Sequence, residues 1–356
     1  MKSLVLGLVL LLAACTGGSS RVASVSPTAP ATSPTAPASP TATAVTTASG
    51  TRITAPSSLA CRLPVTWNVY DGSTTTTRAV FLAFPSGSLT EDATAPPQSR
   101  FFDRAFSRWL PVWRQAVSPD GRRYAYGEGN AWQGTKGKIH VVDVASAVDR
   151  IIYAGGIVFA VVDFSSDGIY MTPAVPEGAP RGLWLLDPAG GTPHVVSSTI
   201  IGPAIGGGAA WGIDFNTADP HPGPGGLEGP RNLVLRFDLK TGASTTWFYE
   251  PGASVYVIGF DPAGHPIVSS VLVDSSGSST MEIWLVTSST SARVLYRGGG
   301  VVWPARVSAV DSHGVWFDSS YASSSESAVW LYAGTTLQIV ATVGAGDLSV
   351  AGGCIP

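Results

Sequence analysis

A short turn followed by a strand recurs five times along the C-terminal part of this sequence, and it constrains the fold more than any other feature. Each copy has Asp, Ser or Gly early in the turn and ends on glycine, with apolar residues after it. Asp and Ser side chains can hydrogen-bond the backbone of such turns, and glycine adopts a positive φ without steric cost. The turns lie at 118–121, 165–168, 206–208, 261–264 and 311–314. This recurrence predicts a repeat architecture.

A hydrophobic strand that ends in a turn follows each of these glycines and is followed by another short strand. The order of strand a, turn, strand b, loop, strand c, turn and strand d repeats every 40 to 57 residues. No stretch shows helical periodicity. The copies of strand c lie at 139–143, 183–187, 234–238, 283–287 and 329–333. Four-stranded units at this spacing predict an all-β fold made of β-propeller blades.

The two ends of the repeat region each supply part of one further blade. Five complete units occupy residues 108 to about 343, after which 347–354 match a strand a that has no strand b after it. Near the other end, 61–69 and 78–84 match strands b and c without a strand a before them. Joining the pieces leaves no long unpaired sheet edge. The sequence thus predicts six blades closed by the N- and C-terminal strands, with seven blades as the alternative.

Two of the three cysteines lie at this predicted junction. Cys354 ends strand a and Cys61 begins strand b of the same split blade. Adjacent strands can bring two Cα atoms to the separation of about 5.5 Å that a disulfide needs. We expect a Cys61–Cys354 disulfide; the alternative is two unrelated buried thiols.

The third cysteine, Cys15, follows a short leader. Lys2 precedes an apolar run at 4–12 that is too short to span a bilayer and fits the core of a signal peptide. The sequence Leu-Ala-Ala-Cys that ends at Cys15 resembles the lipobox of bacterial lipoproteins, which implies cleavage before this residue and lipid attachment to it. The alternative is ordinary secretion with cleavage near Ala14 or later.

The boundaries of three segments follow from these features. Residues 1–14 are the expected lipoprotein signal peptide, and 15–56 form an Ala/Ser/Thr/Pro-rich tether. Such a segment cannot bury enough apolar surface to offset its chain entropy, so we expect it to be disordered. Residues 57–356 are the expected propeller domain.

Residues 118–126, Ser-Pro-Asp-Gly-Arg-Arg-Tyr-Ala-Tyr, resemble the repeat of TolB-like, WD-repeat-like β-propellers. The other copies keep the glycine and at most part of the rest, so the resemblance extends over 61–354 mainly through blade spacing. It implies a six-bladed, non-catalytic periplasmic or surface domain that engages partners, without indicating which partner.

Charge and motifs exclude several classes of function. A net charge of −3 and a pI near 5.9 argue against a nucleic-acid binder. Neither a Gly-x-Ser-x-Gly elbow nor a phosphate-cradling glycine motif occurs. Asp214, Asp219 and His221 are too few donors to predict a metal site, and we expect no cofactor. The recurring Asp residues are interpreted as turn caps, and five tryptophans as packing between blades, at Trp184, Trp211, Trp284, Trp316 and Trp330.

The two longest insertions, at 88–108 and 216–232, are the best candidates for a binding surface. In a propeller, d–a connections and b–c loops emerge on the same face, and loops on a rigid scaffold often carry function. Random variation in loop length is the alternative. The candidate ligand-binding residues are Arg104, Arg108, Trp132, Asp219, His221 and Arg231.

The functional expectation is a monomeric, non-enzymatic propeller, lipid-anchored to the bacterial cell membrane and facing out of the cytoplasm. It would bind a protein or a cell-envelope glycan through the face with the long loops. One alternative is a propeller-type glycan lyase or hydrolase, and another is a structural spacer. An enzyme would need acids or histidines at the starts of several strands a, where the sequence places mainly Arg108, Trp113, Tyr256 and Arg306.

Overall fold

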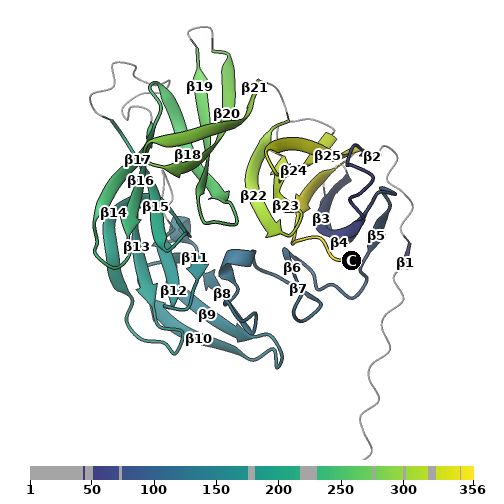
Figure 1. The fold of residues 1–356 in the computed structure, drawn as a ribbon. Helices are drawn as coiled ribbons and strands as arrows, with labels where there is room; N and C mark the ends of the chain where they lie inside the picture. The colour runs from purple at the N-terminus through teal and green to yellow at the C-terminus, as the bar shows by residue number, and fades with distance from the viewer. Residues whose placement is uncertain are drawn as a thin grey trace, which may run out of the picture. The chain divides into compact units, whose positions relative to one another are not determined.

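The computed structural model describes residues 43–44, 51–71, 74–174, 181–216, 231–274, 277–299, 302–319, 326–344 and 346–356. Apart from two 3-10 turns, η1 (Arg114–Ala116) and η2 (Ala131–Gln133), the regular structure of these residues is β. Residues 41–356 form one unit, and its sheets are set around a common centre in chain order (Figure 1). The search of the described residues for a helix that could cross a membrane found none.

The described strands form six blades, as predicted. Blade 1 joins the two chain ends, because β26 (Asp347–Val350) pairs with β3 (Cys61–Asp71), which continues to β4 (Thr74–Phe84) and β5 (Leu89–Glu91). Two short strands, β1 (Thr43–Ala44) and β2 (Arg52–Ile53), pair with the outer strands of blades 1 and 6.

The other blades follow in sequence order. Blade 2 contains β8 (Arg123–Glu128), β9 (Gly137–Asp143) and β10 (Asp149–Gly155), and blade 3 contains β11 (Phe159–Phe164), β12 (Ile169–Pro173), β13 (Arg181–Leu186) and the first part of β14 (His194–Gly206). Blade 4 contains the rest of β14 with β15 (Ala209–Asp214), β16 (Leu233–Asp238) and β17 (Ser244–Tyr249). Blade 5 contains β18 (Ala253–Phe260), β19 (Pro266–Val273), β20 (Ser279–Ser288) and β21 (Ser291–Gly298), and blade 6 contains β22 (Pro304–Asp311), β23 (Gly314–Ser319), β24 (Glu326–Ala333) and β25 (Thr336–Gly344).

Blade 2 differs from the prediction in its innermost strand. We expected strand a to begin at Arg108, but β7 (Arg108–Leu110) pairs instead with β6 (Phe101–Asp103) in a separate hairpin. Strand a is reduced to a single bridge between Val117 and Tyr124. The apolar residues of the hairpin pack against blade 1: the rings of Phe102 and Trp109 lie 5.2 and 5.7 Å from that of Phe81. Burial of these rings therefore accounts for the apolar run that the repeat analysis assigned to a blade strand.

The predicted disulfide between the chain ends is confirmed. Cys61 and Cys354 are bonded, with their Cα atoms 5.7 Å apart and 293 positions apart in sequence. They lie on the neighbouring segments of blade 1, where β26 pairs antiparallel with β3 and Arg62 bridges Ile355 beyond it. Closing so long a loop contributes up to about 5 kcal/mol in the chain-entropy model.

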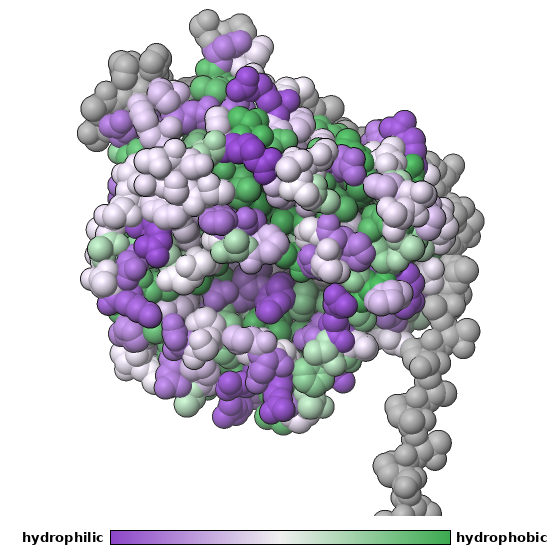
Figure 2. Space-filling view, viewed as in Figure 1, coloured by the Kyte–Doolittle hydropathy of each residue, from purple (hydrophilic) through white to green (hydrophobic). Residues whose placement is uncertain are grey.

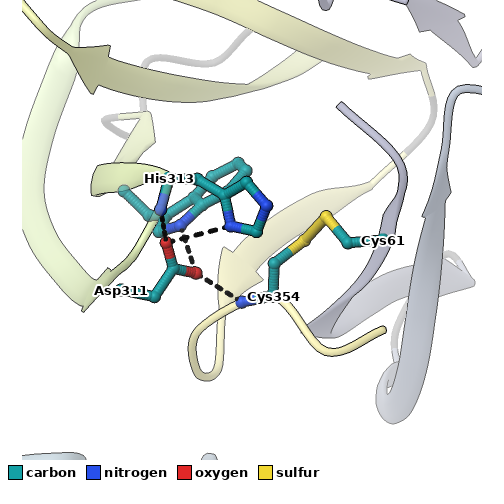
Figure 3. Close-up of a disulfide and its surroundings, with 5 residues drawn as sticks. Cys61, Asp311, His313 and Cys354 are labelled. Atoms are coloured by element: carbon teal, nitrogen blue, oxygen red, sulfur yellow. Dashed lines mark hydrogen bonds and ion pairs between the residues drawn. A yellow bond between two sulfur atoms is a disulfide. The ribbon is translucent and has the colours of Figure 1, made fainter. Parts of the chain in front are cut away.

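Asp311 lies at the a–b turn of blade 6, next to the Cys61–Cys354 disulfide of blade 1 (Figure 3). Its buried carboxylate accepts hydrogen bonds from the Cys354 backbone N–H at 2.6 Å and from Trp316 Nε1 at 2.9 Å. It also accepts one from the His313 backbone N–H at 2.7 Å, which caps the turn as predicted. One carboxylate thus joins blade 6 to the C-terminal segment that closes blade 1.

The predicted role of the tryptophans is also confirmed, because aromatic pairs lie between successive blades. Four pairs link neighbouring blades, at Trp211–Phe260, Phe248–Trp284, Tyr296–Trp330 and Phe84–Trp316. Trp184 packs on Phe159 in a cluster that includes Tyr153 of blade 2. Such large apolar surfaces make the core of the ring a series of interfaces between blades.

Replacing Asp311 with alanine should destabilise the protein more than the same change at Asp261. Asp261 occupies the equivalent turn of blade 5, where it accepts only from groups of its own turn, Ala263 and His265. Asp311→Ala also strips a partner from Cys354 and Trp316, and each buried donor left unpaired costs about 1–3 kcal/mol. Urea denaturation of both variants measures the difference. Equal losses would show that Asp311 acts only as a turn cap.

Candidate functional site

The path of the β6–β7 hairpin determines which residues meet on each face of the ring. We call the face that carries d–a connections and b–c loops the loop face, and the opposite one, with a–b and c–d turns, the turn face. The chain leaves the loop face at Arg100 and runs along β6, where Phe102 N–H donates to the Ala351 carbonyl at 2.7 Å. It turns at 104–107 and returns through β7 to Trp113. The hairpin therefore connects both faces.

This path places Arg104 and Arg108 on the turn face, and our expectation that they lie with the long loops is wrong. Arg104 lines a hollow of about 270 Å³ together with the 118–121 turn of blade 2. Arg108 donates to the Val144 carbonyl, which follows β9 at a c–d turn. The hairpin carries both residues across the ring because Phe102 and Trp109 are buried beside blade 1. Arg108 therefore has a structural partner.

On the loop face, the same segment borders a larger hollow of about 690 Å³ between blades 1 and 6. We call it the loop-face hollow. Hydroxyl and amide side chains form much of its wall, among them Thr66, Asn68, Thr77, Gln98, Ser319 and Ser349. Polar side chains also gather in a depression near the centre of the face seen in Figure 2. Concave sites are the usual place for ligands on proteins, and polar groups in them fix the orientation of the ligand.

An ion pair and an indole ring form the charged part of the loop-face hollow. Arg306 Nη2 lies 2.5 Å from Asp318 Oδ2, and the other carboxylate oxygen accepts from the Val350 backbone N–H at 2.6 Å. Burial raises the pKa of the Asp318 carboxyl, and the adjacent Arg306 guanidinium opposes that rise. The Arg306 guanidinium also lies 4.0 Å from the centre of the Trp113 ring. Two contacts of different kinds therefore fix its orientation.

Arg100 brings a second positive charge to the same ring. Its guanidinium carbon lies 5.1 Å from the centre of the Trp113 ring, and the side chain is exposed. Across the part of the chain that the structure describes, no carboxylate is found paired with Arg100. Among the described residues that line the loop-face hollow, two carry guanidinium groups and one a carboxylate, so this part of the wall is net positive although the chain as a whole has a charge of −3.

The remaining candidates lie elsewhere. Trp132, in η2 within the b–c loop of blade 2, is 70% exposed on the loop face. The guanidinium of Arg231 lies over the Phe215 ring at 5.6 Å, near the start of strand c of blade 4. Neither residue lines the loop-face hollow. Asp219 and His221 lie outside the described residues, as does Cys15.

Sequence reasoning found part of the loop-face hollow and missed its acid. It placed Trp113 and Arg306 near the starts of strands a, and the structure brings these two together. Tyr256 instead lies on β18, 46% exposed and outside the hollow. Asp318 was missed, although β22 and β23 pair in a register that sets Arg306 opposite Asp318. Aligning strands a and b across their glycine turn gives a signal that could have identified this pair.

Known proteins resemble this chain in fold only. No family model matches it, and no curated protein matches it. A solved structure of a protein from Lactobacillus plantarum is 11% identical, with a TM-score of 0.50, over 81% of this chain and 99% of that one. TolB from Acinetobacter baumannii is 12% identical with a TM-score of 0.49, over 82% of this chain and 67% of TolB. An oligogalacturonate lyase from Vibrio parahaemolyticus is 9% identical with a TM-score of 0.44, over 83% and 93%.

These likenesses bear on the architecture alone. Together with the six blades and the disulfide that joins the ends, the likeness to the Lactobacillus plantarum structure shows an all-β propeller. A shared fold does not select a function.

The carboxyl group of Asp163, in strand a of blade 3, makes the stability of the protein depend on pH. Burial raises the pKa of Asp163 from its ordinary value of 3.8 to about 6, while Arg114 acts in the opposite direction. The folded protein thus holds this proton more tightly than the unfolded chain, so the free energy of unfolding falls as pH rises from about 4 to 6. Asp163→Asn should remove this loss, and the variant should exceed the parent protein by about 1–3 kcal/mol above pH 7.

Denaturant titrations at pH 4 and pH 7.5 measure this effect, and the two proteins should be nearly equal at pH 4. Asp120→Asn is the control, because the pKa of Asp120 is shifted in the opposite direction from that of Asp163. The hydrogen bond from Ser118 lowers the pKa of Asp120, so its contribution to stability is present above pH 4 and lost as pH falls. An Asp163→Asn variant that is no more stable at pH 7.5 would contradict the raised pKa.

Proposed function

We propose that this protein is a non-enzymatic, membrane-tethered propeller outside the cytoplasm that binds a protein or a cell-envelope glycan through its loop face. The observation that carries the proposal is the loop-face hollow, which combines polar walls with a net positive charge and a guanidinium of fixed orientation. Preorganised groups raise affinity because less side-chain freedom is lost when the ligand binds.

The chemistry of the hollow favours binding over catalysis. General acid–base catalysis needs a side chain that can exchange a proton with the substrate, most often histidine and otherwise a carboxyl, lysine, tyrosine or cysteine group. Asp318 is the one titratable carboxyl among the described residues that line the hollow, and both its oxygens already accept hydrogen bonds. A lyase or hydrolase in this hollow would need another proton-transfer group, which its described lining does not offer.

The proposed location rests on the leader sequence and on the disulfide. Disulfides persist in oxidising compartments outside the cytoplasm, and Cys61–Cys354 joins the chain ends. The lipobox-like sequence before Cys15 would then supply a lipid anchor, and the Ala/Ser/Thr/Pro-rich segment would separate the ring from the membrane.

Replacing the proposed lipidated residue should release the protein from the membrane. Cys15→Ser removes the thiol that would carry the acyl chains, and a protein without this anchor should move from the membrane fraction to the soluble fraction. Immunoblots of fractionated cells and intact-mass measurement of the purified protein test this. The control is Cys61→Ser, which leaves the proposed anchor in place. Retention of the Cys15→Ser protein in the membrane fraction would contradict lipid anchoring.

Photo-crosslinking in intact cells should show that partners approach from the loop face. A photoreactive residue at Trp132 lies exposed on that face, and one at Arg104 lies exposed on the turn face. We expect crosslinked adducts at position 132 and few at position 104, detected by blotting and identified by mass spectrometry and glycan staining. Adducts confined to position 104 would assign binding to the turn face and overturn the proposal.

A further inference from the structure

We propose that the loop-face hollow binds an acidic saccharide, and that Arg100 and Arg306 hold a carboxylate of the sugar. This inference rests on the proposed function of the loop face and names its ligand class. Three features of its described lining carry the inference: two guanidinium groups at one indole ring, one carboxylate that compensates part of their charge, and many hydroxyl and amide groups.

Arg306 is positioned to bind an anion without being neutralised completely. A guanidinium group has five N–H donors in a planar fork, and one of these bonds Asp318. The Arg306 side chain remains 41% exposed, whereas that of Asp318 is 6% exposed. The buried Asp318 carboxylate therefore fixes one side of the Arg306 guanidinium, and other N–H donors of this group remain for a ligand in the hollow.

Arg100 supplies the charge that makes the hollow attractive to anions. Its guanidinium lies at the Trp113 ring, to which Arg306 is also drawn. Cation–π contact with the indole offsets part of the repulsion between the two positive groups. An anion that bridges them would offset more, and the fork of a guanidinium matches the two oxygens of a carboxylate. The charge balance therefore favours a ligand with a carboxylate.

The wall of the hollow identifies the rest of the ligand. Thr66, Thr77 and Ser349 offer hydroxyl groups, and Asn68 and Gln98 offer amides, which can both donate and accept. Thr77 Oγ1 donates to Asn68 Oδ1 at 2.6 Å, which orients the amide nitrogen of Asn68 as a donor. The one aromatic ring among the described residues of the lining, that of Trp113, is already contacted by two guanidinium groups. A saccharide matches this wall because its hydroxyl groups project in many directions.

The size of the hollow fits such a ligand. A volume of about 690 Å³ lies within the range of about 300–1,000 Å³ found for small-molecule sites. The hollow lies on the loop face, so a longer glycan chain can continue past it into solvent. The site thus suits a short acidic segment within a polysaccharide.

Isothermal titration calorimetry of the full-length mature protein in detergent micelles tests the inference. The probes are an oligosaccharide of hexuronic acid and the neutral hexose oligosaccharide of equal length. We expect the hexuronic acid oligomer to bind and the neutral one to bind at least about tenfold more weakly. Affinity for the acidic oligomer should fall as salt is raised, because the guanidinium groups are partly exposed.

Arg100→Ala is the main variant, since this exposed side chain can be removed without leaving a buried partner. It should weaken binding of the acidic oligomer about tenfold, which corresponds to about 1.4 kcal/mol. Arg306→Lys keeps the charge opposite Asp318 and loses the planar fork, so it should weaken binding as well. Arg104→Ala, on the turn face, is the matched control and should bind as the parent protein does.

Three results would overturn the inference. The first is equal affinity for the acidic and neutral oligomers, and the second is unchanged affinity in Arg100→Ala. The third is that inorganic phosphate or a peptide with a free C-terminal carboxylate binds more tightly than the acidic oligomer. If crosslinks at position 132 persist while the acidic oligomer does not bind, the ligand class alone is wrong. If those crosslinks are also absent, the proposed function fails with it.

Discussion

The rest of the structure depends on the pairing of β26 with β3, because this pairing joins strands from the two ends of the repeat region into one blade. The two strands come from opposite ends of the repeat region, so their pairing closes a very long loop and costs chain entropy. Several interactions stabilise the junction. Among them are four residue pairs between the strands, the Cys61–Cys354 disulfide, and the hydrogen bond from the Cys354 N–H to Asp311 of blade 6. The bond to Asp311 links the junction to the preceding blade, so closure does not rest on one blade alone.

The same junction forms part of the loop-face hollow. Ser349 of β26 lines it, and Val350, the next residue, donates to Asp318. That carboxylate in turn orients Arg306. The position of a charged group on the loop face therefore depends on whether the C-terminal strand is in place. In this arrangement, ring closure and the geometry of the hollow are not independent, since one backbone N–H of the closing strand supports the ion pair.

Much of the fold could be predicted from the sequence because turns and strands are local. The glycine turns, the strand c tryptophans and the split blade each leave a signal within a few residues, and the structure confirms the ring and its disulfide. The β6–β7 hairpin could not be predicted in this way. Its strands are three residues each, and their apolar side chains match those of a blade strand. Only the contact of Phe102 and Trp109 with Phe81 on blade 1, which lies 21 and 28 positions before them, shows where they lie. Because of this contact, Arg104 and Arg108 lie on the turn face and not with the long loops.

The hollow was harder to predict because its residues come from several distant segments and because its key acid is buried. An isolated carboxylate in a strand interior is costly, so Asp318 persists there only with Arg306 opposite it and a backbone donor beside it. Removing Asp318 would leave two guanidinium groups at one indole with no counter-charge, and they would repel each other. A second acid would cancel the excess charge and leave no electrostatic preference for an anion. With one acid for two guanidinium groups among its described residues, the wall keeps an excess of positive charge, and this imbalance is the basis of the anion preference that we propose.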